Sequence, residues 1–139
     1  MANLTMKVDP NWNRHADAAL LLARLVVGAF LIWGVADNIL SSARMAEFAG
    51  FLAQHGFPAP KLMAPLSVYA QAAVGVAFIL GLGARWAGLV CAFNFVVAVV
   101  MVDAQAGIRG AFPATALILF GLLFTAMGAG RYSVDRRLR

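Results

Sequence analysis

Four long apolar runs, separated by short polar segments, dominate the pattern of this chain. They cover residues 18–36, 62–83, 86–102 and 111–130. Each run is close to the ~20 residues that an α-helix needs to cross a hydrocarbon core of ~30 Å. Together they use more than half of the 139 residues, and the segments left over are too short to form a soluble domain. The pattern therefore predicts an integral membrane protein whose chemistry takes place within or beside the lipid.

Polar and turn-forming residues at the ends of the runs set the expected helix boundaries, at about 18–40, 62–83, 86–103 and 111–130. Asp17 is the expected N-cap of the first helix, and Pro113 falls in the first turn of the fourth, where proline is tolerated. Short connections between the last three helices favour antiparallel neighbours. The predicted fold class is all-α: an integral membrane antiparallel four-helix bundle over residues 18–130, with an N-terminal tail at 1–17 and a basic tail at 131–139.

A different pattern fills the loop between the first two long helices. In residues 44–55, apolar side chains recur at helical spacing on one face, while Arg44, Glu47 and Gln54 lie on the other. Gly56 and the prolines that follow it close the segment. We expect a short amphipathic helix here, too short to span, that lies flat at the membrane interface or caps the bundle.

Small residues recur at intervals of four on two of the predicted helices: Ala73, Ala77 and Gly81 on one, and Ala84, Gly88 and Ala92 on the next. Such stripes let helix backbones approach closely in lipid. We expect them to pack the second long helix against the third within one chain. A homo-oligomer interface is the alternative that stays open.

Composition and charge placement agree with a membrane setting, because 63% of the residues are hydrophobic and only 12% are charged. If the helices alternate, seven of the basic residues fall on the side of both termini and three on the other, namely Arg44, Lys61 and Arg109. The positive-inside rule then puts both termini in the cytoplasm of a bacterial-type inner membrane. The net charge of +5 would therefore serve contact with anionic lipid headgroups rather than with nucleic acid.

Three polar residues lie inside the apolar runs, where they are costly and point to a role. Arg24 either snorkels toward the headgroups or faces inward and holds a partner side chain or a ligand's anion. Gln71 and Asn94 fall near the middle of the second and third helices, at comparable depth. They either bond to each other or, with Arg24, line a site for a carbonyl-bearing ligand such as a quinone. These three residues are the candidate ligand lining.

A second polar group is expected at the opposite ends of the helices. Asp37, Asn38 and Asp103 form a candidate outer polar cluster, although solvated helix ends explain the same residues. Their spacing matches no metal motif, so no metal site is predicted. Cys91 is the only cysteine, which excludes an internal disulfide, and we expect it to be a small core residue. The chain shows no complete catalytic set, so its catalytic residues are unknown and the sequence does not decide whether it is an enzyme.

Taken together, these residues resemble the DoxX family of small four-helix membrane proteins. The similarity covers about residues 19–135. It is carried by Arg24 with Gly28, by Gln71 with Gly75, and by three stretches: FAGFLAQHGFPAP at 48–60, GLGAR at 81–85 and GAGRYSVD at 128–135. The resemblance implies a membrane setting and quinone-linked redox chemistry, since the family takes its name from a membrane subunit associated with thiosulfate:quinone oxidoreductase.

This sequence departs from the family pattern in two places. Gly34 and Asn38 stand near positions where members often carry a histidine and a lysine, and Gln71 stands where many members have a glutamate. The ionisable groups are therefore partly neutralised, and a mechanism that relies on them does not carry over to this chain.

Three functional hypotheses follow. The first is a non-catalytic accessory subunit of a quinone-linked membrane complex, which has a redox protein as its partner and no cofactor of its own apart from a bound quinone. The second is a subunit that takes part directly in the oxidation of thiosulfate or other sulfur compounds. The third is a small-molecule permease or a lipid-interacting protein.

Overall fold

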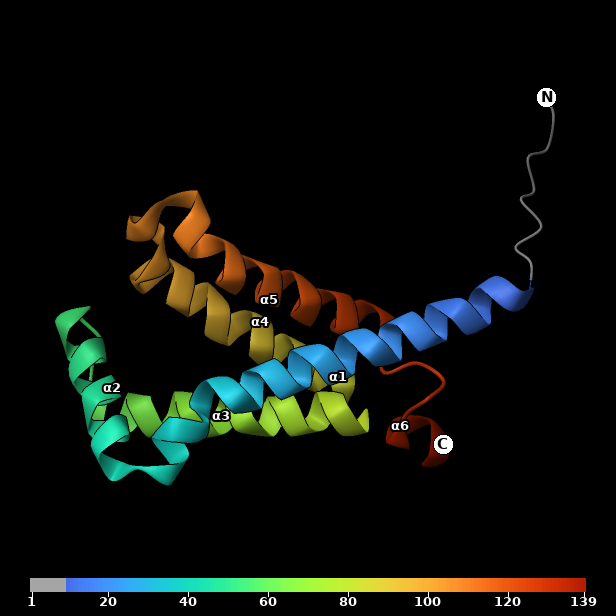
Figure 1. Cartoon of the computed structure of the whole chain (residues 1–139), viewed down its shortest axis with the longest axis horizontal. Coiled ribbons are helices and arrows are strands. Elements are labelled where there is room, and N and C mark those ends of the chain that lie inside the picture. Colours follow the sequence, from blue (N-terminus) through green and yellow to red (C-terminus); the bar gives the residue numbers. More distant parts are fainter. Residues whose placement is uncertain (1–9) are drawn as a thin grey trace.

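A computed structural model describes residues 10–139, and all the regular structure in this range is helical. Four long helices run alternately in opposite directions: α1 (Pro10–Leu40), α3 (Pro60–Leu80), α4 (Ala84–Met101) and α5 (Gly107–Met127) (Figure 1). Shorter pieces are α2 (Ser42–Gln54), the 3₁₀ turn η1 (Asp103–Ala106) and α6 (Val134–Arg137). Four helical segments in the described range are long and apolar enough to cross a membrane. The predicted all-α membrane bundle is confirmed.

The long helices associate closely in two pairs, α1 with α3 and α4 with α5. In the first pair, a methyl group added at Gly28 would lie 2.6 Å from the carbonyl oxygen of Gly75. In the second pair, a methyl group added at Gly121 would lie 2.6 Å from the carbonyl oxygen of Gly88. Because only glycine leaves room for such an approach, these two contacts fix the spacing within each pair.

The expected close approach of the second long helix to the third needs correction. Gly88 and Ala92 of α4 lie against Gly121 of α5, and Gly81 at the end of α3 lies against Ser133 and Arg24. Small residues at intervals of four show that a backbone can be approached closely, but they do not say by which neighbour. The stripe on α4 packs against α5 rather than against α3.

An apolar core joins the two pairs. Phe78 of α3 and Phe124 of α5 are fully buried, and their rings meet edge to face with centroids 4.8 Å apart. Leu31 and Cys91 are buried in the same cluster, which confirms the expected core position of the cysteine. Many large apolar side chains on the outside of the bundle remain exposed, Trp33, Trp86 and Phe93 among them. That distribution suits a bundle surrounded by lipid.

Helix α1 begins at Pro10, well before the expected start near residue 18. At 31 residues it is about 46 Å long, so it extends past a hydrocarbon core of about 30 Å and beyond the other helices (Figure 1). Asp17, the expected N-cap, lies inside the helix instead. Apolar periodicity marks only the lipid-embedded part of a helix, and Pro10 is a suitable first helical residue. The earlier part of the expected tail, including Lys7, lies outside the described residues.

The other boundaries also shift at their polar ends. Helix α5 starts at Gly107, so Pro113 lies in its second turn rather than its first. Helix α3 ends at Leu80 because Gly81 adopts a left-handed conformation, with φ of 69°. The amphipathic segment forms α2, whose N-cap Ser41 accepts a hydrogen bond from the backbone N–H of Arg44. This helix stands across the end of the bundle opposite the termini (Figure 1).

Candidate functional site

Arg24 lies entirely inside the bundle and is the most deeply buried charged residue in the described range. Its guanidinium donates to the carbonyl oxygen of Ala129, and it reaches the carbonyl oxygen of Tyr132 from both terminal nitrogens, at 3.2 and 2.9 Å. The third nitrogen, Nε, is buried and makes no hydrogen bond within residues 10–139. Of the two alternatives for Arg24, the structure supports the inward one, with backbone carbonyls as partners instead of a carboxylate or a ligand.

Gln71 and Asn94 each find a partner other than one another. The Gln71 Nε2 donates to the carbonyl oxygen of Leu31 at 3.1 Å, which links α3 to α1. The Oδ1 of Asn94 accepts from the hydroxyl of Ser67 at 2.9 Å, which links α4 to α3. Of the two alternatives for these amides, the direct bond between them is therefore wrong. Ser67 was missed because a single serine on an apolar helix gives no sequence signal of its own.

The two amides nevertheless line one small cavity, together with Leu31, Val74 and Cys91, which we call the amide cavity. Its volume is only about 10 Å³, roughly the space of a single water molecule. Arg24 is not part of its lining. The three residues expected to form one ligand lining thus lie in two separate places, and the place that holds the amides is too small for a ligand.

The members of the expected outer polar cluster belong to different connections. Asn38 donates from Nδ2 to the carbonyl oxygen of Arg44 at 3.2 Å, which fixes the turn from α1 into α2. Asp37 is exposed near the end of α1, and Asp103 begins η1 between α4 and α5. Across residues 10–139, the His, Cys, Asp and Glu side chains form no group of three that could hold a metal ion.

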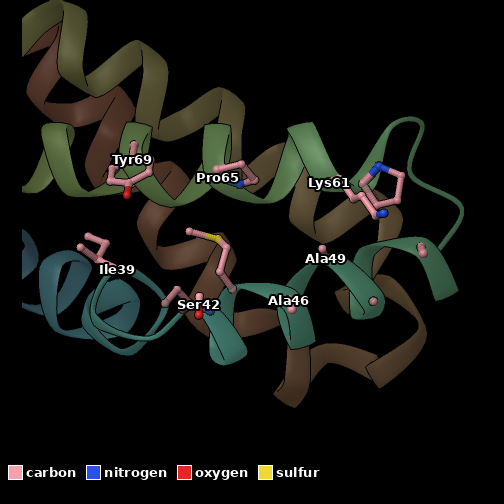
Figure 2. Close-up of a pocket in the computed structure, with 12 residues that line it drawn as sticks. Ile39, Ser42, Ala46, Ala49, Lys61, Pro65 and Tyr69 are labelled. Atoms are coloured by element: carbon pink, nitrogen blue, oxygen red, sulfur yellow. The ribbon is translucent and has the colours of Figure 1, made fainter.

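A larger site opens between the amphipathic helix α2 and the first half of α3. We call it the α2–α3 groove; its volume is about 680 Å³. Figure 2 shows Lys61, Pro65 and Tyr69 along α3 opposite Ser42, Ala46 and Ala49 of α2. The walls are mostly apolar, and the few polar groups include the Tyr69 hydroxyl and the Lys61 ammonium. That size and that mixture are typical of pockets for small ligands. The sequence indicated the two helices but not that they would leave space between them.

A second groove of about 650 Å³, the terminal groove, lies at the end of the bundle where α1 begins and α5 ends. It is lined by the α3–α4 turn, by the end of α5 and by the C-terminal segment, and its polar residues include Arg85, Arg131, Asp135 and Arg136. Asp135 accepts from the backbone N–H groups of Gly83 at 2.8 Å and Ala84 at 3.3 Å, so it caps the start of α4.

Comparison with known proteins bears on the first three long helices. The DoxX family model matches residues 19–104, which run from α1 to the start of η1. The match is shorter than the expected 19–135, and it leaves α5 and the closing GAGRYSVD stretch outside. No curated protein and no solved structure matches the chain.

Proposed function

Because this chain belongs to the DoxX family, we propose that it is an accessory membrane subunit that binds a quinone and docks a redox protein, in a bacterial-type inner membrane. The four membrane-spanning helices support the setting. In this proposal the electron-transferring centre belongs to the partner, and this chain supplies the quinone's place beside it. A quinone bound there would exchange electrons and protons with that centre.

The α2–α3 groove is the observation that carries the quinone part of the proposal. Its apolar walls suit a quinone ring and the start of an isoprenoid chain. The Tyr69 hydroxyl and the Lys61 ammonium make no hydrogen bond or ion pair within the described range, so both are free to donate to a quinone carbonyl oxygen. Asn38 also lines the groove, but its amide already serves the α1–α2 turn.

The candidate lining of Arg24, Gln71 and Asn94 suits a ligand less well. The amide cavity has a volume of about 10 Å³, and a ring could enter only if the helices moved apart. Arg24 is occupied by the carbonyl oxygens of Ala129 and Tyr132. We therefore place the ligand in the α2–α3 groove and assign the inner polar residues to helix association.

Charge placement supports an orientation with both termini in the cytoplasm. Arg14, Arg85, Arg131, Arg136 and the remaining basic residues of the C-terminal segment lie at one end, and Arg44, Lys61 and Arg109 lie at the other. By the positive-inside rule, the end with more arginine and lysine faces the cytoplasm. The α2–α3 groove would then open on the periplasmic side.

Filling the groove tests the quinone site. Gly50 lines it, and a methyl group added at Gly50 would meet no heavy atom within 4 Å, so Gly50→Phe can add a ring to the groove lining without a backbone clash. Ala43 is exposed on the same helix but does not line the groove, which makes Ala43→Phe the matched control. The full chain is purified from native membranes in mild detergent, and bound quinone is extracted and quantified by mass spectrometry.

We expect Gly50→Phe to lose quinone severalfold, and Ala43→Phe to retain it like the unaltered chain. Equal retention in all three proteins would refute a quinone site in the groove. The same preparations are searched for co-purifying proteins. A stoichiometric redox protein is the expected result, and a homo-oligomer without one would contradict the accessory-subunit role.

A further inference from the structure

The arginines that line the terminal groove have more hydrogen-bond donors than the protein's own contacts occupy. Its lining includes four arginines and two aspartates. Both carboxylates are engaged by backbone N–H groups: Asp135 by Gly83 and Ala84, and Asp17 by the N–H of Arg131 at 3.4 Å. The acids are thus committed to holding the C-terminal segment and the α3–α4 turn in place.

Few of the arginine donors make hydrogen bonds within the protein. Arg85 donates from Nη1 to the last carbonyl oxygens of α5, those of Thr125 and Ala126, both at 3.1 Å. Its Nε and Nη2 make no hydrogen bond within the described part of the chain. Arg131 and Arg136 are exposed, and their guanidinium groups make no hydrogen bond or ion pair with residues 10–139. The guanidinium groups of Arg85, Arg131 and Arg136 therefore have donors to offer around one groove, as does that of the exposed Arg139.

The buried charge of Arg24 adds to the positive potential of the terminal groove. Arg24 holds the carbonyl oxygen of Ala129, and Ala129 is itself part of the groove lining. The Arg24 guanidinium forms no salt bridge with a carboxylate in the described range, and its electrostatic partner is the more distant carboxylate of Asp135. A cation in a low-dielectric interior is poorly screened, and it raises the positive potential at the surface above it.

Part of the lining of the same groove is apolar. Trp86 is 76% exposed, Leu138 73% and Met127 51%, and all three belong to the lining. A free inorganic anion would gain nothing from these side chains, whereas a lipid would place its acyl chains and glycerol against them. Tryptophan is also the residue that favours the headgroup level of a bilayer.

We propose that the terminal groove binds the phosphate of an anionic phospholipid, with Arg85, Arg131 and Arg136 as its ligands. Arginine suits this task because its planar fork can donate two hydrogen bonds to one phosphate. Basic pockets at the membrane surface between transmembrane helices are known to hold anionic headgroups. This proposal does not rest on the quinone site, which lies at the other end of the bundle.

Lipid retention by the purified full chain tests the proposal. The protein in neutral detergent is titrated with phosphatidylglycerol or with phosphatidylcholine, and bound lipid is counted by native mass spectrometry. Arg131→Gln/Arg136→Gln removes two of the three ligands. Arg109→Gln is the matched control, because Arg109 is an exposed arginine on α5 near the end of the bundle opposite the termini. Circular dichroism shows that each variant remains helical.

We expect the unaltered chain to prefer phosphatidylglycerol, the double variant to lose that preference by about tenfold or more, and Arg109→Gln to retain it. An equal loss in Arg109→Gln would mean a diffuse charge effect and would overturn the site. A separate arm adds inorganic phosphate. Displacement of the lipid by millimolar phosphate, or binding of phosphate as tight as that of lipid, would assign the site to a free anion and overturn the lipid proposal.

Discussion

Gly88 of α4 lies against the carbonyl oxygen of Gly121 of α5 so closely that a methyl group added at either residue would overlap the opposite backbone. The hydroxyl of Thr125 lies in the same contact, and its single hydrogen is shared between the carbonyl oxygens of Gly121 at 2.9 Å and Arg85 at 3.0 Å. This arrangement joins the two helices without any large side chain between them.

Gly88→Ala should therefore destabilise the bundle. The new methyl group would lie 2.5 Å from the Thr125 hydroxyl oxygen, and we expect a loss of about 1–3 kcal/mol in the free energy of unfolding. Unfolding in detergent, followed by circular dichroism, measures this. The control is Gly50→Ala, where space is open and a better helix former should raise stability by about 0.5–1 kcal/mol. Destabilisation of the same size in both variants would contradict the contact.

Arg24→Leu should free the C-terminal segment. Without the guanidinium, the carbonyl oxygens of Ala129 and Tyr132 lose their donors, at a cost of about 1–3 kcal/mol. We expect faster trypsin cleavage at Arg131, measured by mass spectrometry of timed digests. Arg14→Gln changes an exposed arginine on the same helix. In this variant, trypsin should cleave at Arg131 at the same rate as in the unaltered chain. Protection of Arg131 in Arg24→Leu would show that other contacts suffice to hold the segment.

Asp135→Ala should loosen the start of α4. The carboxylate caps Gly83 and Ala84, and the loss of a helix cap costs typically ~1 kcal/mol. Asp37 is exposed and its carboxylate makes no bond with residues 10–139, so Asp37→Ala is the control and should leave stability unchanged. Thermal unfolding of the two variants side by side distinguishes them, and equal midpoints would rule out the cap.

Gln71→Leu and Asn94→Leu should act on stability and not on ligand. Each removes one interhelical hydrogen bond, with an average cost near ~0.6 kcal/mol in membranes. Because the amide cavity is too small for a ring, we expect quinone retention to stay unchanged in both. A severalfold loss of quinone in either variant would move the ligand from the α2–α3 groove to the helix interior.

The sequence predicts the number of long helices, their alternation and the amphipathic helix, because all three depend on the local spacing of apolar residues. It does not predict that Gly88 faces α5 or that Gln71 bonds to Leu31, because those depend on how the helices rotate against one another. For the same reason, the sequence does not decide whether Arg24 faces the bundle interior or the headgroups. A groove between α2 and α3 has no sequence signature, because it arises where the facing sides of the two helices do not pack against each other.

The structure also relates two of the departures from the family pattern. A methyl group added at Gly34 would lie 3.4 Å from the Gln71 Nε2, so the two positions face each other across α1 and α3. Both positions carry residues without charge, so this contact inside the bundle holds no lone ionised group.

The partners of Arg24 also impose an order on synthesis. The arginine enters the bilayer with the first helix, whereas the carbonyl groups that receive it lie 105 and 108 residues later in the chain. An arginine inside an inserting helix costs up to about 3 kcal/mol, and here 105 further residues must be translated before the first compensating group exists. A nascent chain that stops early would keep an unsatisfied cation in the membrane. Closure of the C-terminal segment thus requires translation past Tyr132, so it follows the synthesis of all four long helices.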